Sequence, residues 1–132
     1  MGLTSSALAE PTIHNLDIPE LSDLKMQTIR ESNEFYTMQK DGGPIKTTVA
    51  GIDVAIAAKL RTLPPENVAI LILKSDFVVR YDLWNGLYNA KLTKDYYSQL
   101  KKCIVESEGF DGNSPSGRAA LEQLDFLYKV GA

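Results

Sequence analysis

Proline and glycine residues divide this chain into segments of helical length, and that division constrains the fold more than any other feature. Breaks fall at Asp41-Gly42-Gly43-Pro44, at Pro64-Pro65 and between Gly109 and Gly112. Between the breaks, apolar residues recur at steps of three and four, which places them on one side of an α-helix. The sequence therefore predicts a mainly α fold, a small bundle of four to five helices with an N-terminal arm.

Two helices are predicted in the first half of the chain. The first runs from about Ile18 to Lys40, because Asp17 followed by Glu20 resembles a capping box and the break after Lys40 contains two glycines. The second runs from about Thr48 to Leu63, where the apolar spacing is again helical and a Pro-Pro pair ends the pattern.

The middle of the chain supports two interpretations. Strand-like alternation at Phe77, Val79, Tyr81 and Leu83 precedes Asn85-Gly86, a dipeptide typical of hairpin turns. The helical pattern is equally regular, with apolar residues at Ile70, Leu73, Phe77, Tyr81, Trp84 and Tyr88. We favour helix because the flanking segments are helical. The alternative is an α+β domain with a hairpin or meander between about Val68 and Thr93.

The last part of the chain is again helical in pattern. One helix is predicted from about Thr93 to Glu108, and another begins with Ser114 as its cap and Pro115 in its first turn. The segment Asp111–Glu122 shares part of the calcium-loop pattern. Pro115 and Ser116, however, stand where that loop needs an oxygen ligand and a glycine. We interpret the segment as a helix start and expect no metal site.

The N-terminal residues differ in composition from the rest. Residues 1–16 form the predicted arm, and residues 17–132 form a single helical domain. The arm is interrupted by turn-forming and polar residues at Thr4, Ser5, Ser6, Pro11 and Asn15. Nothing in this composition would hold the arm still unaided. We therefore expect it to rest on a neighbouring subunit.

The chemistry-bearing side chains argue against catalysis. The chain has one histidine, His14, and one cysteine, Cys103, too few for the common zinc sites, a disulfide, or Ser-His or Cys-His catalysis within a protomer. It also lacks a glycine-rich phosphate loop. We expect no enzyme activity and no cofactor. A net charge of −3 argues against nucleic acid as a partner.

Three further sequence features bear on location. The single cysteine favours a reducing compartment, and the N-terminus lacks the pattern of a secretory signal peptide. No apolar run approaches the length needed to cross a bilayer. We expect an intracellular protein, soluble or within an assembly, and not a secreted one.

We therefore predict a non-catalytic structural or interaction subunit of a larger protein assembly. Its partners are other protein subunits, which can include copies of itself. Aromatic side chains carry much of the energy of protein interfaces, and a lysine-rich helix side can meet an acidic surface. The candidate partner-binding residues are Trp84, Tyr81, Tyr88, Lys94, Lys101 and Lys102.

Two alternatives remain open at this point. Met1 to Ser6 matches the N-myristoylation pattern with Gly2 as acceptor, so the chain could be a peripheral membrane adaptor, and a membrane is a partner only if Gly2 is acylated. One acyl chain gives weak attachment and needs a second signal, which the lysines could supply. The other alternative is a small enzyme or ligand-binding domain with a deep polar pocket.

Overall fold

A computed structural model of the chain describes residues 13–31, 35–40 and 43–132. These residues form six helices and one β-hairpin, which confirms the predicted mainly α bundle with one helix more than expected. In chain order the elements are α3 (Ile18–Arg30), β1 (Phe35–Lys40), β2 (Gly43–Thr48), α4 (Val49–Arg61), α5 (Pro65–Lys74), α6 (Phe77–Ala90), α7 (Lys94–Val105) and α8 (Pro115–Val130).

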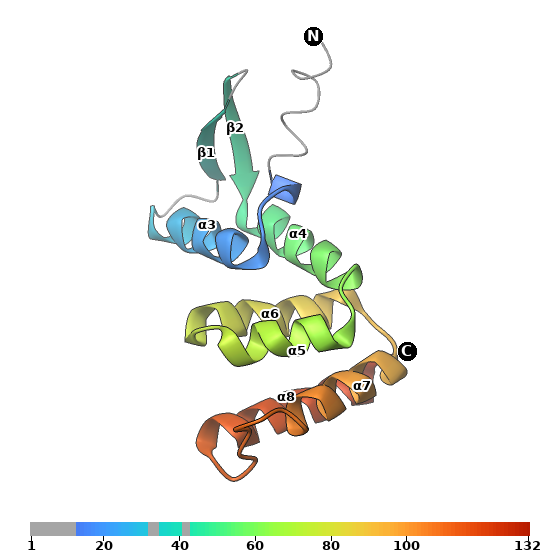
Figure 1. The fold of residues 1–132 in the computed structure, drawn as a ribbon. Helices are drawn as coiled ribbons and strands as arrows, with labels where there is room; N and C mark the ends of the chain where they lie inside the picture. Colours follow the sequence, from blue (N-terminus) through green and yellow to red (C-terminus); the bar gives the residue numbers. More distant parts are fainter. Residues whose placement is uncertain (1–12, 32–34, 41–42) are drawn as a thin grey trace.

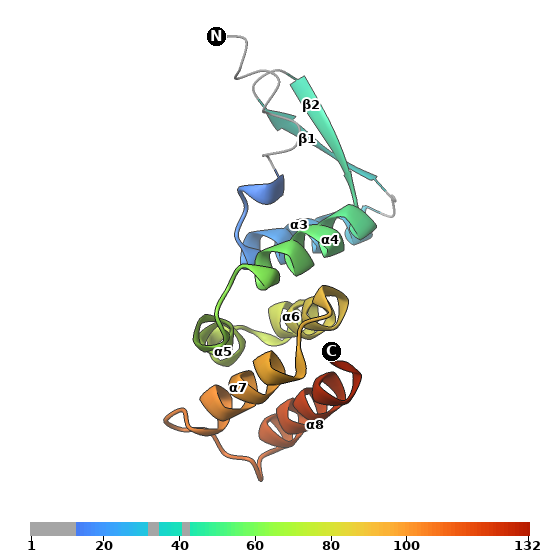
Figure 2. The same cartoon turned by 90° about the vertical axis from the view of Figure 1, so that its right-hand side faces the viewer.

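The helices are stacked in three tiers (Figure 1). The pair α3–α4 forms one end of the stack and carries the hairpin, α5–α6 form the middle tier, and α7–α8 form the other end (Figures 1 and 2). Helix α4 packs on α6, and α5 packs on α7, so each tier is joined to the next.

The helix starts follow the capping signals in the sequence. The Asp17 carboxylate accepts a hydrogen bond from the Glu20 backbone N–H at 2.8 Å, and the Glu20 carboxylate accepts one from the Asp17 N–H at 2.9 Å. This reciprocal pair is the predicted capping box of α3. Ser114 caps α8 through a 3.0 Å bond from the Gly117 N–H, with Pro115 in the first turn as predicted.

The predicted end of the first helix at Lys40 is wrong. Helix α3 ends at Arg30, and Phe35–Lys40 forms a strand that pairs antiparallel with Gly43–Thr48. Aromatic and β-branched residues such as Phe35 and Thr37 favour a strand. Paired glycines are also as suitable for a hairpin turn as for a helix stop, so the same signal had two meanings.

The middle of the chain is helical, so the α+β alternative with a hairpin or meander between Val68 and Thr93 is wrong. The segment forms two helices because Asp76 starts a new one, its carboxylate accepting the Val79 N–H at 3.0 Å. Helix α6 ends at Ala90, and the φ of 52° at its C-cap, Lys91, lies in the left-handed region. Asn85-Gly86, the expected hairpin turn, lies inside α6.

One apolar core unites the six helices. Its buried members come from every helix, for example Leu21 of α3, Ile56 of α4 and Leu127 of α8. Ile13 and Leu16, which belong to the predicted arm of residues 1–16, also pack against this core. The rest of the predicted arm, residues 1–12, lies outside the described residues.

Candidate functional site

A pocket of about 730 Å³ lies between the first halves of α6 and α8. Helix α5 and the loop between α7 and α8 complete its walls. Further along the two helices, the ring of Tyr88 stacks on the ring of Phe126, with 5.7 Å between the centroids. The helices are therefore joined at this end and leave a gap at the other, which we call the α6–α8 groove.

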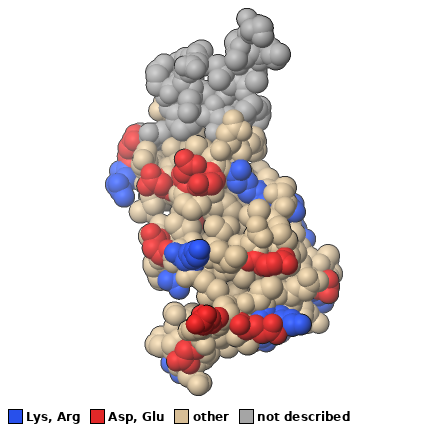
Figure 3. Space-filling view, viewed as in Figure 1, with Lys and Arg blue, Asp and Glu red and all other residues tan. Residues whose placement is uncertain are grey.

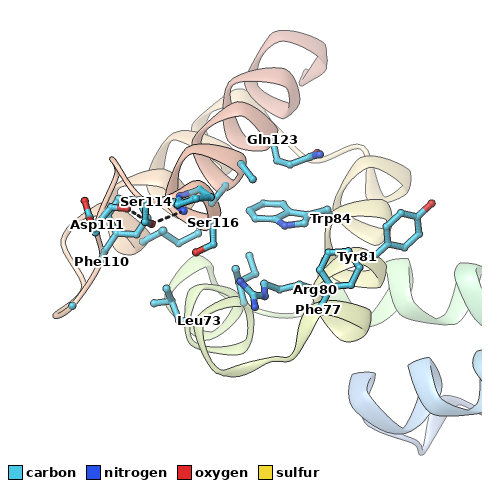
Figure 4. A pocket seen from close by; sticks show the side chains of 17 residues that line it. Leu73, Phe77, Arg80, Tyr81, Trp84, Phe110, Asp111, Ser114, Ser116 and Gln123 are labelled. Atoms are coloured by element: carbon cyan, nitrogen blue, oxygen red, sulfur yellow. Dashed lines mark hydrogen bonds between the residues drawn. The ribbon is translucent and has the colours of Figure 1, made fainter.

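The walls of the groove are largely apolar and aromatic. Phe77 and Tyr81 of α6 are 79% and 64% exposed, and Trp84 and Phe110 are partly buried. Figure 4 shows Trp84 and Tyr81 on one side of the pocket and Phe110 on the other. Large aromatic side chains at this level of exposure, gathered in one concave surface, are typical of interaction sites.

One cationic side chain lies among these apolar groups. Arg80 is the only lysine or arginine among the described residues that line the groove, and its side chain reaches into the pocket (Figure 4). The Nε of Arg80 is buried and has no hydrogen-bond partner within the described residues. A buried guanidinium N–H without an acceptor costs free energy. The groove is therefore suited to a ligand that supplies an anionic or carbonyl oxygen.

The loop wall of the groove is held by its own hydrogen bonds. The Ser114 hydroxyl donates to the Asp111 carbonyl at 2.7 Å, and the Asp111 carboxylate accepts the Asn113 N–H at 2.9 Å. The chain passes so close to Gly117 that a Cβ there would collide with the Asp111 carbonyl. Glycine is therefore required at this position. This wall is preformed.

A second polar cluster lies on the opposite side of α6. The Asp82 carboxylate, 4% exposed, accepts a hydrogen bond from the Ser22 hydroxyl at 2.5 Å and pairs with the Lys25 ammonium at 3.0 Å. Lys25 also pairs with Asp53 at 2.9 Å. Burial alone would lower the pKa of Lys25, but the two carboxylates outweigh it and raise the pKa above its ordinary value. Lys25 therefore stays charged and joins α3, α4 and α6.

Two neighbouring tyrosines on α7 also have raised pKa values. Burial, with smaller effects from Tyr97, Glu66 and Cys103, raises the pKa of Tyr96 to about 12. Its hydroxyl donates to the Leu63 carbonyl at 2.8 Å, and the Tyr97 hydroxyl donates to the Leu87 carbonyl at 2.6 Å. Both hydroxyls therefore act as protonated donors that tie α7 to neighbouring elements.

The structure places the predicted aromatic residues along one side of α6. Trp84 and Tyr81 line the groove, and Tyr88 lies at its closed end against Phe126. The apolar stripe that the sequence assigned to this segment is thus its outer side. The buried side of α6 carries Leu83 and Leu87 instead.

The predicted lysines do not form one surface with the groove. The Lys94 ammonium donates to the Tyr128 and Lys129 carbonyls at 2.7 and 3.1 Å. These bonds give hydrogen-bond donors to carbonyls in the last turn of α8. Lys101 pairs with Asp125 at 3.2 Å on an exposed surface, and Lys102 is exposed. Figure 3 shows acidic and basic side chains mixed over the face that it presents. Gly2, the predicted acylation site, lies outside the described residues.

Three contributors to the groove were not predicted as site residues from the sequence. Phe77 was assigned to an apolar helix stripe, and Arg80 and Phe110 were not singled out. A cationic residue one turn after an aromatic one is a common helix pattern, so Arg80 carried no distinguishing signal. Phe110 lies in a loop whose path the sequence does not indicate.

Two properties of the described residues bear on other classes of site. None of their histidine, cysteine, aspartate and glutamate side chains form a group of three or more able to hold a metal ion. Within the same ranges, no helix combines the length and the apolar character that crossing a membrane requires. Comparison of the chain with protein-family models, curated proteins and solved structures finds no match.

Proposed function

We propose that the protein is a non-catalytic interaction subunit of a larger assembly, and that it binds a segment of a neighbouring protein in the α6–α8 groove. The observation that carries the proposal is the preformed groove with exposed aromatic walls. Phe77, at 79% exposed, contributes little to folding where it stands. Burying a side chain of this size at an interface contributes about 1.5 to 3 kcal/mol.

The apolar surface extends beyond the pocket, which favours a protein segment over a small molecule. Leu73 of α5 is an exposed groove residue, and Ile70, one turn before it, is exposed as well. A small ligand enclosed in the pocket would leave this part uncovered. A helix or extended segment lying along the groove would cover both.

The experiment compares groove variants of the full chain with a matched variant elsewhere. Phe77→Ser and Tyr81→Ser remove exposed aromatic groups from the groove. Val54→Ser removes an apolar group that is 65% exposed on α4, away from the groove. Light scattering and sedimentation measure the assembly formed by the purified chain, and the same variants are compared in complexes from the native source.

The proposal predicts that both groove variants reduce assembly at unchanged melting temperature, and that Val54→Ser does not. Assembly that all three variants leave unchanged would contradict it. A chain that is monomeric when purified and in its native extract would contradict it as well.

A further inference from the structure

We propose that the occupant of the α6–α8 groove is the N-terminal segment, residues 1–12, of a second copy of this chain, with the Glu10 carboxylate paired with the Arg80 guanidinium. The inference rests on the proposed function and goes further by naming the partner and its polar contact.

The groove sets two requirements for its occupant. It must bring apolar side chains to Phe77, Trp84 and Phe110, which form the walls. It must also bring one hydrogen-bond acceptor to the buried Nε of Arg80, which finds none among the described residues. A carboxylate meets the second requirement best, since it accepts charge-assisted hydrogen bonds from a guanidinium in a fixed geometry.

The composition of residues 1–12 meets both requirements. Apolar side chains are present at Met1, Leu3 and Leu8. Glu10 is the one charged side chain in the segment, and Arg80 is the one cationic side chain among the described residues of the groove. Asp111 is the other charged residue of the described lining, so a carboxylate is favoured beside Arg80 and disfavoured beside Asp111, which gives a single favourable register.

The arrangement of the tiers favours binding between two copies over binding within one. Ile13 packs on the core, and the described chain begins beside α4, at the α3–α4 end of the stack (Figures 1 and 2). The groove lies between the middle and the far tier. Twelve residues span at most about 40 Å when extended, and within one copy part of that reach would be used in passing the middle tier, whereas a neighbouring copy can bring its groove to the segment directly.

The test is a charge exchange in the full chain. Self-association of the wild type, Glu10→Arg, Arg80→Glu and the double variant is measured by sedimentation between about 1 µM and 1 mM, the range of weak associations. Each single variant should weaken association by roughly tenfold to a hundredfold, as expected for a lost charge-assisted hydrogen bond. The double variant should recover to within about threefold of the wild type, since the pair is restored with its signs exchanged.

Three controls keep the test decisive. Glu122→Arg makes the same charge change at an exposed position of α8 that does not line the groove, and should leave association unchanged. Should Arg80→Glu fail to fold, Glu10→Arg and Leu8→Ser alter the segment without touching the groove, and both should weaken association. A peptide of residues 1–12 is also added to the protein while the fluorescence of Trp84, the only tryptophan, is recorded. Its emission should shift to shorter wavelength.

The outcomes separate this inference from the proposed function. If Phe77→Ser weakens association and the residue 1–12 variants do not, the groove binds another segment and only this inference is overturned. If neither set has an effect, both proposals fall. Single variants that weaken association without rescue in the double variant would overturn the Glu10–Arg80 pair. A chain that stays monomeric while Glu10→Arg shifts the Trp84 emission would show docking within one copy and overturn the inference.

Discussion

The two sides of helix α6 differ in how closely the rest of the molecule packs against them. One side, which we call the closed face, carries the buried residues Asp82, Leu83, Gly86, Leu87 and Ala90. The other, the open face, carries Phe77, Arg80, Tyr81, Trp84 and Tyr88 along the α6–α8 groove and its closed end. The larger side chains are on the side with less to pack against. Folding alone does not explain their presence there.

The closed face is built for close approach. A Cβ at Gly86 would lie 2.7 Å from atoms of both Ile56 and Leu60, so the absence of a side chain allows α4 and α6 to touch. Beside this contact, Asp82 joins α3 through Ser22 and Lys25. The polar groups of this cluster therefore have their partners within the chain. On the open face, Phe77 is 79% exposed, and the Nε of Arg80 has no hydrogen-bond partner among the described residues.

The largest effect on stability is expected from the carboxylate of the closed face. Asp82→Ala leaves the Ser22 hydroxyl and one side of the Lys25 ammonium without an acceptor in a buried site. The free energy of unfolding should fall by about 3 kcal/mol. Urea unfolding measures the change, with Asp125→Ala, in the exposed pair with Lys101, as the control, at under about 1 kcal/mol. Equal effects of the two variants would contradict the account of the closed face.

A smaller loss of stability is expected when a side chain is added to the close contact between α4 and α6. Gly86→Ala requires the buried side chains of Ile56 and Leu60, or the helix that carries them, to shift, and we expect the strain of about 1 to 3 kcal/mol to exceed the helix propensity that alanine gains over glycine, about 1 kcal/mol. Thermal unfolding should show a net decrease. Ser98→Ala, at an exposed site on α7, tests the propensity gain without the contact. A Gly86→Ala variant that is more stable than the wild type would mean that the helices do not approach this closely.

Raising the pH should lower the free energy of unfolding through the loss of the Lys25 charge. The pKa of Lys25 is raised above 10.5 in the folded state by Asp53 and Asp82, against the effect of burial. The stabilisation from the raised pKa is complete below pH 10.5 and is lost as pH rises through the folded-state pKa. Stability should therefore fall more steeply there in the wild type than in Lys25→Met, as measured by urea unfolding over pH. If the free energy of unfolding falls equally with pH in the two proteins, the carboxylates do not raise the pKa of Lys25.

The smallest effect on stability is expected on the open face. Phe77→Ser removes a side chain that is 79% exposed, so the free energy of unfolding should change by less than about 0.5 kcal/mol, while assembly is reduced. Chemical unfolding at low protein concentration measures the first quantity and light scattering the second. A loss of stability as large as that of Gly86→Ala would mean that the open face also serves folding, and the distinction between the faces would disappear.

Local signals in the sequence predicted much of the fold. The capping box at Asp17, the Ser114 cap and the helical spacing through the middle of the chain were all confirmed, because each depends on neighbouring residues. The hairpin was missed because a glycine pair suits both a helix end and a hairpin turn. Whether a glycine pair ends a helix or forms a hairpin turn depends on whether a partner strand is present, and the pair itself does not show this.

The groove was less predictable than the helices. The sequence identified Trp84, Tyr81 and Tyr88 as a group, but not which side of α6 would be buried. That choice depends on Gly86 and Asp82, whose roles become visible only when α4 and α3 are in place. The groove itself results from the separation of α6 from α8, and Phe110 reaches it from a loop. Contacts between distant segments of this kind leave no local pattern.

The most direct test of the open face is the accessibility of Trp84 as a function of protein concentration. Acrylamide quenching reads this side chain alone, because the chain has no other tryptophan. If the groove binds a segment of a neighbouring copy, quenching should decrease as the full chain associates, and Phe77→Ser should delay that decrease to higher concentration. Quenching that stays constant while the protein assembles would show that the groove remains uncovered, and would contradict the account.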